Sequence, residues 1–133
     1  MHARMTQSRN FKVGLVQMAM STSPDENLRA AASWVEKAAK QGAQVVCLPE
    51  LFRSPYFCQK EDAAIFDLAE PIPGPSTALL SDVAKKHGVA IVASLFERRA
   101  PGLYHNTAAI LDADGGTCHL PADHTYAWPS HCQ

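Results

Sequence analysis

A glutamate, Glu50, follows directly after a short apolar run, residues 45–48, that is typical of a buried strand. Pro49 ends this run, because proline has no N–H to donate to a neighbouring strand. A strand end holds a side chain rigidly, and the apolar neighbours Leu51 and Phe52 would disfavour the ionised carboxyl group. These conditions suit a general base, so Glu50 is the candidate catalytic residue. The alternative is a solvated glutamate in a loop.

Soft metal-ligand side chains gather near the end of the chain. They are Cys118, His119, His124, His131 and Cys132. Their spacing matches no standard zinc motif, so we expect no metal site here and no cofactor. A metal-binding tail stays as a minor alternative.

The elements that must position Glu50 alternate between strands and helices. Residues 11–18 and 44–48 are predicted strands, and a helix between them opens at Ser23 with a capping box to Glu26 and ends at Gly42. A strand, a helix and a strand joined by short links form a right-handed parallel crossover. A second helix is predicted over 76–87, followed by an antiparallel pair of strands, 89–97 and 103–112.

The segment 53–75 is rich in proline and aromatic residues, and we interpret it as a loop with a short helix near 61–68. Residues 1–10 are predicted to be a disordered N-terminus. Residues 116–133 lack periodicity, so we expect a non-native or disordered tail that does not fold with residues 11–115.

Composition excludes several functional classes. Hydrophobic residues make up 47% of the 133 residues and charged residues 19%, which is ordinary for a globular protein. A net charge of −1 without a basic cluster argues against a nucleic-acid partner. No apolar run is long enough to cross a membrane, and no signal peptide is evident. A cytoplasmic protein is the resulting expectation.

Six short segments, in order and at matching spacing, resemble the nitrilase, or carbon–nitrogen hydrolase, superfamily. They are KVGLVQM at 12–18, CLPELF at 47–52, YFCQ at 56–59, EPIPGPST at 70–77, ASLFE at 93–97 and LYHNTA at 103–108. Within the superfamily these segments are most similar to those of N-carbamoylputrescine amidases. The resemblance implies an α/β fold of the αββα sandwich type, of which this chain would form part: a mixed sheet with helices on one face. A homo-oligomer is compatible with it.

The resemblance implies a Glu-Lys-Cys triad that hydrolyses N-carbamoylputrescine to putrescine, CO₂ and ammonia. Only Glu50 can be carried over, because no lysine follows Lys86 and neither Cys118 nor Cys132 has the family's Cys-Trp context. We therefore expect this chain alone to be inactive. The alternative is a fragment that acts as an interaction or regulatory partner of a full-length homologue through an exposed apolar sheet face.

Four further residues resemble positions of the family's substrate pocket. Tyr56 and Phe57 would give an aromatic wall suited to an aliphatic amine, with Gln59 beside them, although the loop could instead pack onto the core. Asn106 resembles a strand asparagine beside the active site, where it would hydrogen-bond nearby backbone. A surface-facing asparagine is the alternative.

Overall fold

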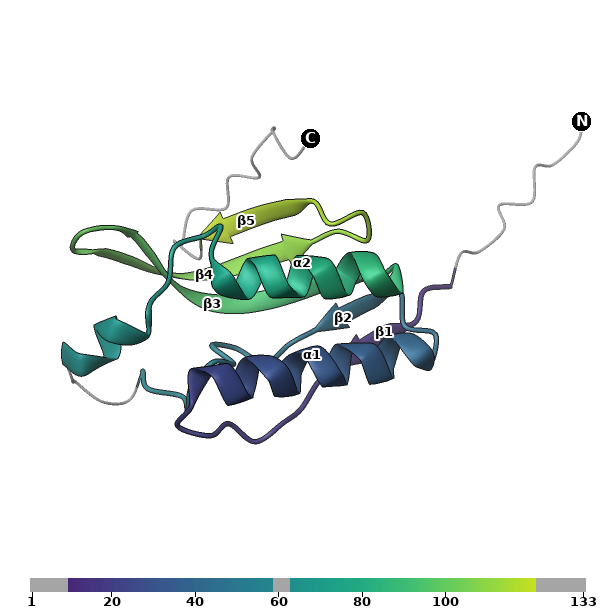
Figure 1. Cartoon of the computed structure of the whole chain (residues 1–133), viewed down its shortest axis with the longest axis horizontal. Coiled ribbons are helices and arrows are strands. Elements are labelled where there is room, and N and C mark those ends of the chain that lie inside the picture. The colour runs from purple at the N-terminus through teal and green to yellow at the C-terminus, as the bar shows by residue number, and fades with distance from the viewer. Residues whose placement is uncertain (1–9, 59–62, 122–133) are drawn as a thin grey trace, which may run out of the picture.

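A mixed sheet forms the framework of the protein. The computed structural model describes residues 10–58 and 63–121, with side chains to residue 118. Within these residues five strands lie in the order β1 (Val13–Leu15), β2 (Val45–Cys47), β3 (Ala90–Ala100), β4 (Leu103–Leu111) and β5 (Thr117–Pro121) (Figure 1). The pairs β1–β2 and β2–β3 are parallel, and β3–β4 and β4–β5 are antiparallel. The expected mixed α/β sheet is thus confirmed.

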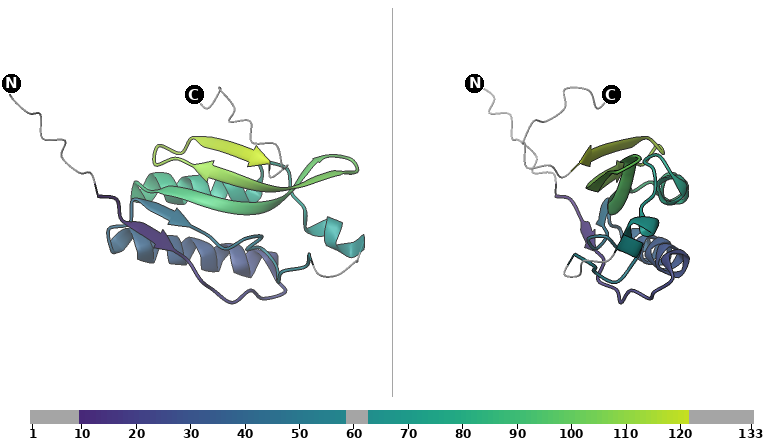
Figure 2. Two further views of the ribbon diagram at one scale, coloured as in Figure 1. Left: turned by 180° about the vertical axis from the view of Figure 1, so that it is seen from behind. Right: turned by 90° about the vertical axis from the view of Figure 1, so that its left-hand side faces the viewer.

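Two helices, α1 (Pro24–Lys40) and α2 (Pro75–His87), cover one face of the sheet. Figure 2 shows them side by side on that face, while the opposite face carries no helix of the described residues. None of the described helices has the length and apolar character needed to cross a bilayer. The two helices form one layer packed on the sheet, as expected for half of a sandwich.

The helix ends follow from local chemistry. Ser23 accepts a hydrogen bond from the Glu26 N–H and caps α1. The reciprocal half of the predicted capping box is absent, because the Glu26 carboxylate instead accepts a hydrogen bond from the Ser21 hydroxyl. Gly42 follows the end of α1 with φ of +87°, and Gly88 ends α2 with φ of +63°. Both glycines stand where the chain turns back into a strand.

The core lies between the helices and the sheet. Ala31 and Val35 of α1 and Leu80 of α2 are fully buried against Val46 and Ile91 of the central strands. Alternate residues of β3 are buried on this face, which is the pattern of a sheet with one packed side. Helix packing therefore holds β3 and also β2, whose carboxyl end leads to the candidate site.

The sheet extends past the boundary predicted at residue 115, because Thr117–Pro121 pairs with β4 as a fifth strand. The turn with Gly115 at φ of +93° sends the chain back along the open edge of β4. Ladder hydrogen bonds come from the backbone, so a segment with no clear side-chain pattern can still pair. Residues 1–9 and 122–133, about which we also made predictions, lie outside the described residues.

Other predicted elements are present, although their ends differ from the prediction. The short helix near 61–68 is a 3₁₀ helix, η1 (Ala63–Leu68), and the first strand is much shorter than residues 11–18. These differences concern element ends, where hydrogen bonding frays.

Candidate active site

Glu50 lies just beyond the carboxyl end of β2. Leu48 N–H still bonds to the Val92 carbonyl at 2.9 Å, and Pro49 then ends the pairing. Leu51 has φ of +49°, an unusual left-handed conformation for a leucine. Its side chain and that of Phe52 turn into the core, being 3% and 0% exposed. Glu50 stays exposed, so these two residues anchor the turn but do not cover the carboxylate as we expected.

A chain of hydrogen bonds from β3 and β4 holds this turn. Asn106 Nδ2 donates to Glu50 Oε1 at 2.7 Å, and Ser94 Oγ donates to Asn106 Oδ1 at 3.0 Å. Ser94 Oγ also accepts from the Leu51 N–H at 3.1 Å. We expected Asn106 to bond nearby backbone, but its described hydrogen bonds join two side chains. The strand asparagine therefore lies beside the candidate base.

Sequence reasoning missed Ser94. The available signal was a single polar residue within the otherwise apolar run 89–96. Ser94 and Asn106 both lie on the sheet face opposite the helices, since the residues that alternate with them are buried on the helix side. The site therefore opens on the uncovered face.

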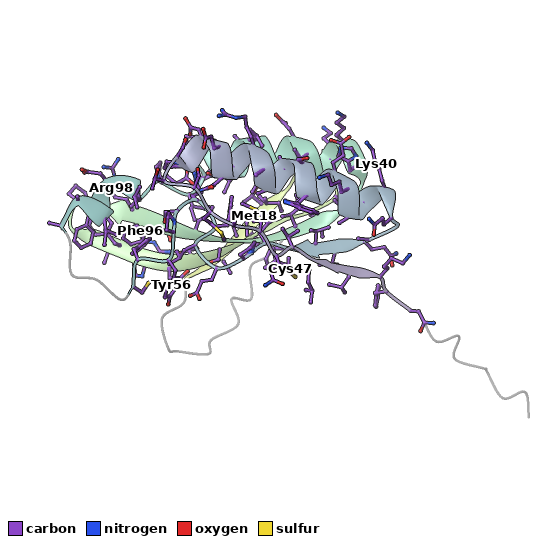
Figure 3. The ribbon with its side chains drawn as sticks, turned by 90° about the horizontal axis from the view of Figure 1, so that it is seen from below. Met18, Lys40, Cys47, Tyr56, Phe96 and Arg98 are labelled. Carbon is purple, nitrogen blue, oxygen red and sulfur yellow. The ribbon has the colours of Figure 1, made fainter. Side chains whose placement is uncertain are left out.

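Tyr56 lies close to Glu50 in the loop after the turn. Its side chain is 54% exposed, and a hydrogen bond with Cys58, the charge of the Cys58 thiolate and the charge of Glu50 raise the pKa of Tyr56 above its usual 10.0. In Figure 3, Tyr56 and Phe96 lie toward the same end of the sheet, whereas Lys40 lies at the other end. Gln59 lies outside the described residues, so its predicted role stays a prediction.

Phe57 is part of a cluster of four aromatic rings. Its ring centroid lies 5.1 Å from that of Phe96, and Phe66 and Tyr104 complete the cluster with a separation of 4.5 Å between their own rings. Phe96 pairs directly with Asn106 across β3 and β4. An apolar wall thus begins next to the asparagine that holds Glu50. It could contact the apolar part of a substrate, although the rings also pack on one another.

Contacts of Arg53 hold the loop that carries Tyr56. The Arg53 guanidinium bonds Asp25 at 3.0 Å and the buried Glu70 at 3.2 Å. Asn27 of α1, which is 2% exposed, donates from Nδ2 to the Arg53 carbonyl at 2.9 Å. These contacts fix the loop relative to α1 and so limit where the Tyr56 side chain can lie.

The described residues supply a proton acceptor but not a full triad. The lysines that the structure describes are Lys12, Lys37, Lys40, Lys85 and Lys86. They lie in the last turns of α1 and α2 or beside the start of β2, at the opposite end of the sheet from Glu50. The described residues hold no cluster of three or more potential metal ligands, and three of the five soft ligands predicted near the chain end lie outside them.

Comparison with known proteins identifies the family. The model of the carbon-nitrogen hydrolase family matches residues 12–126. The chain therefore belongs to the carbon-nitrogen hydrolase family, which is part of the nitrilase superfamily. This match also extends beyond the domain end that we predicted at residue 115.

Named relatives are amidases and a citrullinase. The chain is 39% identical over 105 residues to omega-amidase NIT2-B of Xenopus laevis, covering 79% of this chain and 37% of the relative. It is 39% identical over 107 residues to citrullinase of Francisella tularensis, covering 80% of this chain and 37% of the relative. The carbon-nitrogen hydrolase of Helicobacter pylori G27 superposes with a TM-score of 0.74 at 37% identity, covering 82% of this chain and 39% of that structure. The chain thus spans less than half the length of these relatives.

Proposed function

We propose that this chain provides the general-base half of a small-molecule amidase site. The observation that carries the proposal is the bond from Asn106 Nδ2 to Glu50 Oε1, which fixes a carboxylate at the end of β2. Within the described residues Glu50 Oε2 accepts no hydrogen bond, so one oxygen is held and the other can accept a proton. A fixed carboxylate with one available oxygen is what general-base catalysis needs.

The reaction would use covalent catalysis of the kind the family resemblance implies. A cysteine thiolate attacks the amide carbonyl and expels the amine, and water then cleaves the acyl-enzyme. Glu50 would accept the thiol proton and pass it to the leaving amine in the first step, and would then accept the water proton and return it to the released thiolate in the second. A lysine would stabilise the oxyanion that forms at the carbonyl. In this proposal the lysine and cysteine come from a part of the catalytic domain that the described residues do not contain.

The substrate class is a small amide or carbamoyl amide. N-carbamoylputrescine is the particular substrate that the sequence motifs suggest. The aromatic cluster beside Asn106 offers apolar surface to an aliphatic chain. The names of the relatives point instead to an omega-amide or to citrulline. The proposal therefore covers all three compounds, and a substrate panel must decide among them.

A chimera tests the general-base assignment. Residues 12–112 of this chain would replace the matching segment of the Helicobacter pylori hydrolase, and ammonia release from the three compounds would be measured. We expect no release by the present chain alone, release by the chimera, and a loss of about 10²- to 10⁴-fold in the chimera with Glu50→Gln.

Glu26→Gln, an exposed glutamate on α1, is the matched control and should leave the chimera active. Undiminished activity with Glu50→Gln would remove Glu50 from the mechanism. Turnover by the present chain alone, lost with Glu50→Gln, would show instead that this chain has a complete site.

A second candidate function is an interaction module. The observation that favours it is the uncovered sheet face, where Leu15 is 80% exposed and Val13 is 52% exposed. Exposed apolar surface of this kind marks binding sites for other proteins or for a second copy. Its test is a measurement of association of the purified chain with itself.

A further inference from the structure

We propose that Ser94 is a positioning residue that sets the orientation of the Asn106 amide and, through it, of the Glu50 carboxylate. This inference deepens the proposed function, because it assigns a role to a residue one step removed from the candidate base.

The Ser94 hydroxyl makes two hydrogen bonds of opposite sense. It accepts from the Leu51 N–H at 3.1 Å and donates to Asn106 Oδ1 at 3.0 Å. The Leu51 N–H occupies one of the two acceptor lone pairs of the hydroxyl, and the single hydroxyl proton is directed at Asn106 Oδ1. The backbone of the turn after β2 thus restricts the directions that the hydroxyl can take.

A fixed hydroxyl determines which way the asparagine amide points. A serine that donates requires Asn106 Oδ1 on its side, which leaves Nδ2 facing Glu50 Oε1 at 2.7 Å. If the amide flipped, its oxygen would face the carboxylate and its NH₂ would face the serine. The Asn106 oxygen would then oppose the Glu50 carboxylate, and the Ser94 proton would lose its acceptor, which is unfavourable. Ser94 and Glu50 together therefore select the amide orientation in which Nδ2 donates to Glu50.

The contacts form a closed ring. It runs from Glu50 along the chain to the Leu51 N–H, then to Ser94 Oγ, to the Asn106 amide and back to Glu50 Oε1. Leu51 stands at φ of +49°, a left-handed conformation that is unfavourable for a leucine. The Leu51 N–H bond to Ser94 helps to hold this conformation. One hydroxyl of β3 thus fixes both the backbone and the side chain of the base.

Nuclear magnetic resonance of the full 133-residue chain tests this inference without any need for turnover. The probes are the Asn106 Nδ2 protons, followed by their hydrogen exchange and by their chemical shift as pH falls and Glu50 takes up a proton. The charge of Glu50 also acts on Tyr56, which titrates only in the alkaline range. In the wild-type chain the amide shift should follow the acid titration, and in Glu50→Gln it should not.

Substitution of Ser94 should uncouple the Asn106 amide from the protonation of Glu50. In Ser94→Ala the Asn106 amide protons should exchange about 3- to 10-fold faster, and their acid titration should shrink or vanish. Ser94→Thr keeps a hydroxyl and should restore both properties. Ser81→Ala, which removes a hydroxyl of α2 that bonds Thr117, is the matched control and should change neither. Backbone amide exchange in β3 and β4 reports in each variant that the fold is intact.

An unchanged titration and unchanged exchange in Ser94→Ala would overturn the proposal, as would loss of the coupling in a folded Ser94→Thr. If Ser94→Ala does not fold, Ser94→Cys replaces it, and its weak thiol donor should give an intermediate loss of coupling. A positive result here, together with an inactive chimera, would leave Ser94 as a positioning residue and reject the amidase proposal. The two failures are therefore distinguishable.

Discussion

At the scale of single residues, the candidate site depends on side chains far apart in the sequence. Glu50 and Asn106 are 56 residues apart, and Leu51 and Ser94 are 43 apart. The sheet register brings them together, because β3 follows β2 and β4 follows β3. Precision at the carboxylate is therefore a property of the sheet rather than of the loop that carries Glu50.

The environment of Tyr56 gives a prediction about pH. The hydrogen bond and charge of Cys58 are the largest causes of its raised pKa, followed by the charge of Glu50. In Cys58→Ala the Tyr56 phenol should therefore titrate at lower pH, closer to 10.0. Ultraviolet absorbance of the phenolate measures this, with Tyr56→Phe to assign the signal. An unchanged midpoint in Cys58→Ala would contradict the assigned cause.

The raised pKa of Tyr56 also determines how its contribution to the free energy of unfolding changes with pH. A raised pKa in the folded state means that folding favours the neutral phenol over the phenolate. The stabilising contribution is therefore fully present below about pH 10, the usual value for tyrosine, and is lost as pH rises through the higher folded value. Because Tyr56 is exposed, we expect only a small effect, detectable as the difference from Tyr56→Phe in alkaline urea titrations.

At the scale of elements, one asparagine of α1 connects two loops. Asn27 accepts from the Ser21 N–H at 2.8 Å, donates to the Ser21 carbonyl at 2.8 Å and donates to the Arg53 carbonyl at 2.9 Å. The loop before α1 and the loop after Glu50 are thus held by one buried side chain. The position of the candidate site relative to the helix layer depends on these hydrogen bonds of Asn27.

Removal of the Asn27 side chain should lower the free energy of unfolding. Asn27→Ala leaves buried backbone groups without partners, so we expect a loss of about 2 kcal/mol in the free energy of unfolding. Ser33→Ala, at an exposed position on the same helix, should change stability by less than about 0.5 kcal/mol. Urea unfolding measures both. Equal effects of the two substitutions would show that the Asn27 hydrogen bonds contribute no net stability.

Element prediction succeeded where the signal is local. The cap at Ser23, the glycines after each helix and the apolar run of residues 89–96 are local signals, so α1, α2 and the β3–β4 hairpin could be predicted. Strand β5 could not, because its pairing depends on the free edge of β4 and not on its own side-chain pattern. Ser94 was missed for the same reason, since its role comes from partners on other elements.

At the scale of the whole molecule, the two faces of the sheet differ. One face packs on α1 and α2, while the described residues leave the other uncovered (Figure 2). Gly14 faces the helix side, where an added Cβ would meet the Ala38 Cβ at 3.0 Å, so Val13 and Leu15 face the uncovered side. Cys47 pairs with Leu15 across β1 and β2 and faces the same way. Glu50 and Asn106 thus lie at the margin of an apolar surface.

Such a surface predicts self-association. Burial of Leu15 in an interface would contribute about 1.5–3 kcal/mol, so a charge at this position should oppose association strongly. We expect the purified chain to sediment as dimers or larger species at micromolar concentration and Leu15→Lys to shift it toward the monomer. Leu103→Lys, the same change at the exposed tip of the β3–β4 hairpin, should leave the distribution unchanged. Analytical ultracentrifugation over a range of concentrations measures all three proteins.

The direction of each outcome distinguishes the two candidate functions. Association that Leu15→Lys weakens and Leu103→Lys does not would show that the uncovered face is an interface, as the interaction module requires. Equal weakening by both substitutions would place the contact elsewhere and remove the argument for this face. A monomeric wild-type chain that binds no hydrophobic dye would mean that the face is covered within the chain itself. The interaction module would then lose its supporting observation, and the base at the sheet margin would remain the feature that a function must explain.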